Sequence, residues 1–455
     1  MPESSDFRAQ DLIDRVRADL DARPAVFTPP SQAVPLPART DVASLALGAV
    51  AAASLVAADL AGSTTVPVDA ERVAVAYSSE RWLRIGGVAP TAFAPLSGFF
   101  PTRDGWVRTH GNYPHHAAVL RAVLGLGADA GRDDAAGALR TRDADEVSAA
   151  VSAAGGLCMP VLPEDPDADA RLREAPLLAT TRLGDAPPAP MPGGPSDAPL
   201  RGIRVLDLTR VIAGPVGTRT LALLGADVLR IDPPRLSEIA AQHLDTGHGK
   251  RSALLDLATT AGRARFDALL ATADVVALGY RASALDALGL SPAALAQRRP
   301  GIIVVRHSAW GDADRRGFDS LVQAASGIAW AEAPDADTPG ALPAQALDHS
   351  AGYLLATAAM TLLQRRAAEG GSWLAETSLR RVAAELLGRP RTATPQPAAA
   401  LPAADAHTQT FDVEGVTVTT AAPAVAYVGG PARFAAPRPW GRDDAAWAVI
   451  GDDAG

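Results

Sequence analysis

Residues 202–208 read Gly-Ile-Arg-Val-Leu-Asp-Leu, and this short run of mainly apolar side chains decides the fold class. Such a run is typical of a buried strand. Residues 213–215, Ala-Gly-Pro, lead into a helix-like stretch, residues 216–224, which Gly225 ends in the C′ position. The sequence here predicts a buried strand, a turn and a helix, which together form the first unit of an α/β fold.

The same alternation continues beyond this unit. Residues 226–232 read as a second strand that Pro233 stops, and residues 274–278 and 301–305 read as further strands, with a helical segment at residues 261–271. Strands that alternate with helices pair in parallel through right-handed crossovers. We therefore predict an α/β fold with a Rossmann-like parallel sheet in its large domain.

A sheet of this kind often binds a dinucleotide at its first strand-to-helix turn. That turn carries Gly214 and Gly217 but lacks the full G-x-G-x-x-G spacing. Asp232 ends the second strand, where a ribose-binding acid would lie, yet Pro215 removes a backbone N–H that a pyrophosphate would use. NAD binding is therefore the weaker alternative.

Proline-rich segments divide the chain, and a length of 455 residues favours two domains. The expected division is an N-terminal extension (1–36), a small α/β domain (37–184), a proline-rich linker (185–198), a Rossmann-like domain (199–387), a second linker (388–406) and a C-terminal tail (407–455).

Composition narrows the classes of function. Hydrophobic residues make up 48% and charged residues 20%, a balance typical of soluble globular proteins. The formal net charge of −9 and the pI of about 5.4 disfavour non-specific binding to nucleic acid or an anionic membrane. Cys158 is the single cysteine, so no internal disulfide can form and a reducing compartment is expected.

Two segments bear on membranes. Residues 1–20 are charged and lack the apolar core of a signal peptide. Residues 42–58 are uncharged and rich in alanine, but this length is marginal for crossing about 30 Å of hydrocarbon. We therefore expect a buried helix there, and a cytoplasmic protein without membrane or nucleic-acid partners.

At this point the sequence resembles a known family. Residues 200–215 look like the opening strand and turn of family III (CaiB/BaiF-type) CoA-transferases. Four later segments resemble parts of that family in the same order: residues 224–234, 249–257, 273–289 and 317–324. The resemblance implies a fold of the family III type, with CoA or acyl-CoA as substrate, a carboxylic acid as partner, and no tightly bound cofactor.

The family places its nucleophilic aspartate before a helix of small residues, and Asp348 occupies that position ahead of residues 354–366. From the residues alone, Asp348 reads as a helix N-cap. The resemblance implies instead that it is the catalytic carboxylate, and a helix N-terminus would favour its ionised form.

The resemblance also covers the first region, but in an unusual order. Residues 104–110 and 140–156 look like parts that normally follow the aspartate-bearing domain, as though the second half of a family member preceded the first. Family members form interlocked dimers, so a homodimer is a further expectation. Asp348 requires region 37–184, from its own chain or a partner, to close over it.

The resemblance also implies residues that bind CoA. By matching position these are Ile212, Lys250, Arg251, Tyr280, Arg281, Trp310 and the glycine pair Gly86 and Gly87. Cationic side chains suit phosphates, aromatic rings suit adenine or the pantetheine arm, and a glycine pair suits a flexible loop. For the charged residues a solvated surface charge is the alternative, for the aromatic residues a core aromatic is the alternative, and for the glycines it is a plain β-turn.

Two departures from the family pattern narrow the function. The racemase branch has a histidine where this chain has Phe318, and a phenyl ring cannot carry a proton. Gly279 stands where many members have a CoA-contacting asparagine. A CoA-transferase is therefore expected, with an acyl-CoA racemase or a catalytically impaired CoA-binding paralogue as alternatives. The spacing of His110, His115 and His116 matches no metal template, so no metal site is expected.

Overall fold

The computed structural model describes residues 5–91, 93–312, 314–393 and 406–448. The helices are α1 (Ser5–Asp19), α2 (Val42–Ala61), α3 (Ala70–Tyr77), α4 (Ser79–Trp82), α5 (Pro114–Leu124), α6 (Arg132–Leu139), α7 (Ala144–Ala153), α8 (Pro166–Glu174), α9 (Ala213–Leu223), α10 (Ala240–Thr246), α11 (Thr260–Leu270), α12 (Ala282–Asp286), α13 (Pro292–Arg298), α14 (Asp319–Ala325), α15 (Ile328–Ala331), α16 (Ala346–Glu369) and α17 (Leu379–Leu387). The strands are β1 (Arg84–Ile85), β2 (Gly98–Pro101), β3 (Trp106–Thr109), β4 (Cys158–Pro160), β5 (Ala179–Gly184), β6 (Arg204–Leu208), β7 (Asp227–Asp232), β8 (Lys250–Leu254), β9 (Val275–Leu278), β10 (Ile303–Ser308), β11 (Ser372–Ser378), β12 (Thr408–Val413) and β13 (Val416–Ala421).

The central sheet has seven strands in the order β5-β11-β10-β9-β6-β7-β8. The strands from β6 to β11 pair in parallel, while β5 joins the edge antiparallel to β11. Numbered by their place in the chain, the six parallel strands follow the order 3-2-1-4-5-6, which is that of the Rossmann fold. The predicted α/β class and the Rossmann-like large domain are therefore confirmed.

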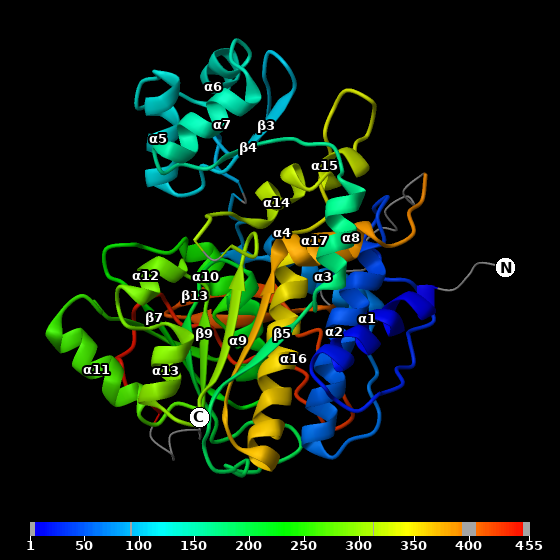
Figure 1. Ribbon diagram of the computed structural model, residues 1–455, viewed down its shortest axis with the longest axis vertical. Coiled ribbons are helices and arrows are strands. Elements are labelled where there is room, and N and C mark those ends of the chain that lie inside the picture. Colours follow the sequence, from blue (N-terminus) through cyan, green and yellow to red (C-terminus); the bar gives the residue numbers. More distant parts are fainter. Residues whose placement is uncertain (1–4, 92, 313, 394–405, 449–455) are drawn as a thin grey trace.

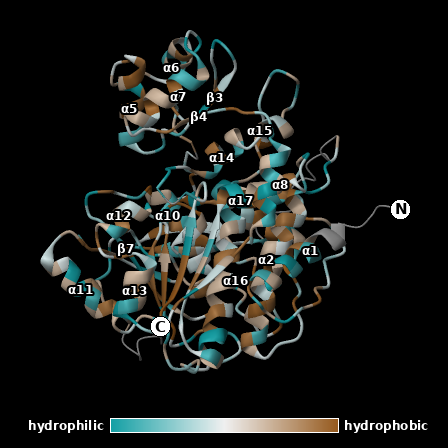
Figure 2. Ribbon diagram, in the orientation of Figure 1, coloured by the Kyte–Doolittle hydropathy of each residue, from teal (hydrophilic) through white to brown (hydrophobic). Residues whose placement is uncertain are grey.

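Both faces of this sheet are covered by helices, because successive side chains of a buried strand point to opposite sides. Val205 joins the core that includes α2, α9 and α16, whereas the next residue, Leu206, joins the core that includes α11 and α13. Figure 2 shows hydrophobic residues concentrated along these strands. The strands are thus buried on both sides, as their mainly apolar sequences predict.

The helix pair α9 and α16 packs very closely on one face of the sheet. A Cβ added to Gly352 would lie 2.6 Å from the carbonyl oxygen of Ala213, and one added to Gly217 would lie 2.9 Å from the carbonyl oxygen of Gly352. Only glycine allows this approach. The contact fixes the position of α16, the helix on which Asp348 lies.

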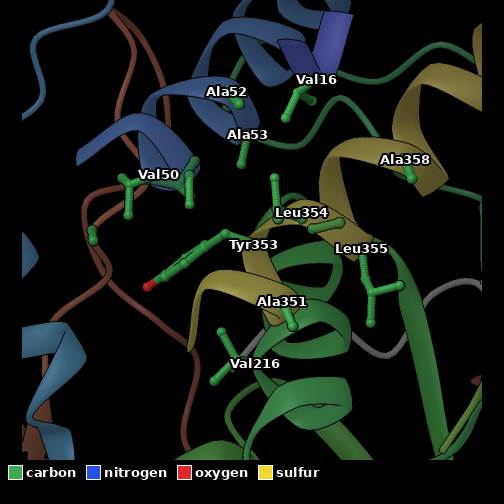
Figure 3. Close-up of a cluster of buried hydrophobic side chains, with 14 of the residues drawn as sticks. Val16, Val50, Ala52, Ala53, Val216, Ala351, Tyr353, Leu354, Leu355 and Ala358 are labelled. Atoms are coloured by element: carbon green, nitrogen blue, oxygen red, sulfur yellow. The ribbon is translucent and has the colours of Figure 1, made fainter. Parts of the chain in front are cut away.

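Helix α2 packs against α16 on the side away from the sheet, and Figure 3 shows Val50 and Ala53 of α2 in one cluster with Tyr353 of α16. By length and composition α2 could cross a membrane, but 83% of its apolar window is buried inside the structure. The helix expected at residues 42–58 is therefore present and buried, and it ends three residues later, at Ala61.

A smaller α/β unit lies at the top of Figure 1, above the end of the sheet toward which the parallel strands run. It contains the antiparallel sheet β2-β3-β4 and the helices α5, α6 and α7. The rest of the region expected as a small domain has other partners: α2 packs on α16, β5 joins the large sheet, and β1 pairs with β13 of the tail. Of the expected second linker, residues 394–405 lie outside the described part of the chain.

Candidate active site

A cavity of about 520 Å³ opens at the carboxyl ends of the parallel strands. Its lining includes Leu208, which ends β6, and Gly279, which follows β9. The chain leaves these two neighbouring strands in opposite directions along the sheet, since β7 lies beyond β6 and β10 lies beyond β9. Ligands of open α/β sheets bind at such a topological switch point.

Arginine side chains form part of the lining of this cavity. Five line it, and each follows the carboxyl end of a parallel strand: Arg210, Arg235, Arg281, Arg315 and Arg316. Arg210 pairs with Glu238, and Arg235 lies 3.5 Å from Asp256. Among the described residues the other three have no ion-pair partner. An unpaired cationic cluster in a cleft attracts an anionic ligand.

Asp348 lies at the inner end of this cavity, in the first turn of α16. The alternative interpretation of Asp348 as a helix N-cap is wrong, because α16 begins two residues earlier and Gln345 is the N-cap. The Asp348 side chain is 6% exposed, and its backbone N–H donates to Oδ2 of the buried Asp319 at 2.9 Å.

The electrostatic setting of Asp348 also differs from expectation. Burial, followed by repulsion from Asp319, raises the pKa of Asp348 well above its ordinary value. Burial likewise raises the pKa of Asp319 to about 6. Loss of water therefore outweighs the favourable field of the helix N-terminus, and ionisation of Asp348 is harder than for an ordinary aspartate.

The smaller α/β unit supplies the opposite wall. Tyr113, His115 and His116 line the same cavity as Asp348. The Tyr113 hydroxyl donates to Oε1 of Glu238 at 2.5 Å, and Glu238 is itself bound by the buried Arg230 at 2.6 Å. A hydrogen-bonded chain thus ties the small unit to the sheet. The predicted requirement that region 37–184 close over Asp348 is met within one chain.

Phe318 lies where the two units meet, and the ring of His110 stacks on it with centroids 4.0 Å apart. Both rings line a second pocket of about 70 Å³, which Asp348 also lines. Burial lowers the pKa of His110 to about 3, so its imidazole is neutral at ordinary pH. The site therefore contains an uncharged histidine on the small unit, next to a phenylalanine that cannot carry a proton.

Val211 also lines both pockets. Its φ of 70° is a left-handed conformation that β-branched residues rarely adopt. Strained backbone of this kind is concentrated at functional sites. It occurs here in the turn between β6 and α9, directly beside Ile212, the N-cap of α9.

Four of the residues expected to act together do lie together. Asp348, Tyr280 and Arg281 line the large cavity, and Ile212 lines the small pocket with Asp348. The Tyr280 hydroxyl already donates to Oδ1 of Asp232 at 3.1 Å. Its ring and the guanidinium of Arg281 are thus the parts available to a ligand.

Lys250 and Arg251 do not line either pocket. The Lys250 ammonium is buried, with Asp207 Oδ2 at 3.0 Å, Thr218 Oγ1 at 2.6 Å and the Pro215 carbonyl at 2.8 Å. Arg251 pairs with Asp227 at 2.5 Å. Lys250 therefore has a structural role in the sheet, which is neither the expected contact with CoA nor the alternative of a solvated surface charge.

The other predicted residues also lie outside the pockets. The Trp310 indole N–H donates to the carbonyl of Arg316 at 2.8 Å, and the guanidinium of Arg315 stacks on its ring at 4.1 Å. Trp310 thus contacts two members of the arginine cluster, Arg315 and Arg316, without lining the cavity itself. Gly86 and Gly87 both have positive φ and form a turn in which Ile85 and Val88 bond to each other. The β-turn interpretation is the one that this local geometry supports.

Asp232 explains why a nicotinamide dinucleotide fits poorly. Its carboxylate is paired with Arg230 at 2.7 Å and also accepts from Trp440 at 2.9 Å. A ribose would have to displace these partners.

Among the described residues, no group of three His, Cys, Asp or Glu side chains is placed to hold a metal ion, and this includes the histidines of the small unit.

Comparison with known proteins agrees with this geometry. Residues 200–419 match the model of CoA-transferase family III. The chain is 30% identical over 213 residues to a probable fatty acyl-CoA transferase of Mycobacterium tuberculosis, covering 43% of this chain and 54% of that protein. It is 32% identical over 200 residues to an acetyl-coenzyme A transferase of Hypoxylon pulicicidum, covering 41% of this chain and 34% of that protein.

Among solved structures, a CAIB/BAIF family protein from Brucella suis is 25% identical, with a TM-score of 0.39, and the match covers 48% of this chain and 65% of that one. The chain thus spans about a third to a half of the length of the curated relatives named above. The resemblance noted in the sequence is confirmed for residues 200–419.

Proposed function

Because residues 200–419 are those of CoA-transferase family III, we propose that the chain moves CoA from an acyl-CoA donor to a carboxylic acid, with Asp348 as the nucleophile. The observation that carries this proposal is the position of Asp348, which lies where an arginine-lined cavity meets a second, smaller pocket. CoA is a substrate in this proposal and not a resident cofactor.

The reaction proceeds by exchange at three carbonyl carbons, those of the donor, of Asp348 and of the acceptor. A carboxylate oxygen of Asp348 attacks the donor thioester, the C–S bond breaks, and an acyl-aspartyl anhydride and CoA thiolate form. The thiolate then attacks the aspartyl carbonyl, releasing the donor acid and leaving an aspartyl-CoA thioester. The acceptor carboxylate attacks that thioester, and the released thiolate attacks the acceptor carbonyl of the new anhydride. Acyl-CoA leaves and Asp348 is restored.

Two features of the site support this chemistry. The arginines that line the large cavity suit the phosphates of CoA, since guanidinium groups bind phosphate oxygens through paired hydrogen bonds. Burial of Asp348 limits the access of water that would hydrolyse an anhydride. Because the pKa of Asp348 is raised, increasing pH favours the ionised carboxylate that makes the attack.

Trapping tests the proposal. The protein is incubated with an acyl-CoA and hydroxylamine, and Asp348 is examined by peptide mass spectrometry for a hydroxamate. We expect the adduct only when acyl-CoA is present, and none in Asp348→Asn, which keeps the size of the side chain. Full transferase activity in Asp348→Asn would overturn the assignment.

Acyl-CoA epimerisation is the second candidate, and His110 is the observation that favours it. His110 lines the small pocket with Asp348, so an imidazole is present although position 318 is phenylalanine. The low pKa of His110 makes it a weak base. We therefore expect no exchange of the α-hydrogen of an acyl-CoA in deuterated water.

A homodimer and a cytoplasmic location stay predictions.

A further inference from the structure

The small pocket adjoins the large cavity. The two share four lining residues: Tyr113, Val211, Phe318 and Asp348. A thioester whose carbonyl carbon lies at Asp348 therefore has a separate space on each side. The five arginines line the large cavity, so the CoA moiety is assigned to that side and the acyl group to the small pocket.

The size of the small pocket limits the acyl group. Its volume is about 70 Å³, measured as room for the centres of water-sized spheres. One ordered water needs roughly 10–15 Å³ by this measure, so the pocket holds about five or six non-hydrogen atoms. That corresponds to an acyl group of three or four carbons. A long fatty acyl chain does not fit without opening the small unit.

The wall of the pocket presents polar atoms that lack a partner within the described residues. Nδ1 of His110 and Oε2 of Glu80 are both buried and make no hydrogen bond there. A buried polar atom has lost its contact with water, so a ligand group that hydrogen-bonds to it is favoured over an apolar one. The pocket is therefore equipped to hydrogen-bond a polar group on its ligand.

The charge of the wall decides what kind of polar group fits. Within the described residues none of the side chains that line the pocket is lysine or arginine. The nearby Arg108 does not line it, and its guanidinium stacks on the rings of Phe93 and Phe99. His110 is uncharged, and burial raises the pKa of Glu80 to about 7, so Glu80 is neutral or anionic. A second carboxylate on the acyl group would find no lysine or arginine among the side chains that line the pocket.

Resting on the proposed transferase function, we propose that the small pocket binds a short acyl group with an uncharged hydrogen-bonding substituent, such as a hydroxyl, which His110 and Glu80 contact. The substrates of this chain are then short hydroxy acids rather than dicarboxylic acids or long fatty acids. His110 and Glu80 act as specificity-determining residues, and Asp348 performs the chemistry.

A panel of four thioesters tests this assignment: 3-hydroxybutyryl-CoA, butyryl-CoA, succinyl-CoA and octanoyl-CoA. The measurement is kcat/KM for CoA transfer with each donor to one fixed acceptor. We expect 3-hydroxybutyryl-CoA to exceed butyryl-CoA by about fivefold, the worth of one or two hydrogen bonds, and both to exceed the other two donors by more than tenfold. A preference for succinyl-CoA or octanoyl-CoA would overturn the inference.

Substitutions at His110 and Glu80 test whether these two residues determine the preference for the hydroxyl-bearing acyl group. In His110→Leu and Glu80→Leu the hydroxybutyryl-to-butyryl ratio of kcat/KM falls toward one, whereas Glu80→Gln, which keeps the hydrogen-bonding atoms, retains most of it. His407→Leu is the matched control, since His407 pairs with Glu71 outside both pockets, and its ratio stays unchanged. An unchanged ratio in both leucine variants would contradict the role given to His110 and Glu80.

Trapping with hydroxylamine distinguishes a failure of the proposed transferase function from a failure of the substrate inference. If no acyl-CoA of the panel labels Asp348, the proposed transferase function fails and the pocket assignment fails with it. If Asp348 is labelled but the adduct forms most readily from succinyl-CoA or octanoyl-CoA, only the substrate inference is wrong. The panel on the unaltered protein gives this answer even if a variant does not fold.

Discussion

The backbone N–H of Asp348 donates a hydrogen bond of 2.9 Å to the carboxylate of Asp319, so the two carboxyl groups are held close together away from water. Asp319 fixes the start of α16 and at the same time opposes ionisation of Asp348. The contact with Asp319 therefore positions the proposed nucleophile and adds to the effect of burial in raising the pH at which it becomes reactive.

Asp319→Asn should move the pH dependence of the reaction. Asparagine retains an oxygen that accepts the Asp348 N–H but removes the negative charge that raises the pKa of Asp348. The pKa of Asp348 then falls, and the acid limb of the profile of kcat/KM against pH shifts to lower pH. Asp129→Asn, on an exposed turn, leaves the profile unchanged. A shift toward higher pH would refute this relation.

The unpaired arginines should govern affinity for CoA. Arg281→Gln and Arg316→Gln each remove a charge from the cavity, and we expect each to weaken CoA binding about tenfold, the worth of one charge-assisted hydrogen bond. Isothermal titration with CoA and with dephospho-CoA shows which phosphate is affected. Arg201→Gln, on the surface away from the cavity, is the control. Equal affinities for all three variants would show that CoA lies elsewhere.

Lys250 should matter for stability and not for ligand affinity. Lys250→Met leaves Asp207 buried without its cation, and this costs about 3–5 kcal/mol in the free energy of unfolding. Adding Asp207→Asn removes the stranded charge and restores part of the loss. Denaturant unfolding of both variants measures this difference. A Lys250→Met protein of normal stability and weakened CoA binding would restore the sequence-based role.

Gly352→Ala tests how closely α16 must approach α9. The new methyl group meets the Ala213 carbonyl at 2.6 Å, so the helices must separate, at a cost of about 1–3 kcal/mol. Activity should fall as well, because α16 carries Asp348. Gly137→Ala is the matched control, since Gly137 lies on the exposed helix α6 with nothing near its Cβ, and there alanine should stabilise by about 0.4–1 kcal/mol. Thermal unfolding distinguishes the two directions.

Much of the central sheet could be predicted from the sequence, because β6, β7, β9 and β10 are apolar runs between clear breakers. Strand β8 was not expected as a strand. It begins Lys250-Arg251-Ser252, and its lysine is buried only because Asp207 lies across from it in the folded sheet. Edge strand β5 is mostly exposed and carries no such pattern.

Only part of the site could be predicted, because several of its residues come together only in the folded chain. Asp348 could be found from the family pattern, but its burial beside Asp319 depends on two segments that only the fold brings together. The arginine cluster comes from four separate loops. Its one sequence signal is that each arginine closely follows a strand end, at Arg210, Arg235, Arg281, Arg315 and Arg316. His110 has no sequence signal of its own, since it reaches the site only through the docking of the small unit.

The joining of both cavity walls in one chain has a consequence for genetics. Where two copies share a site, two different defective copies can restore each other, since one mixed site receives an intact half from each. In this chain His110 and Asp348 face the same pocket from a single polypeptide. A cell that carried one allele altered at each position would therefore form no site with both residues intact, and the two alterations would not complement each other.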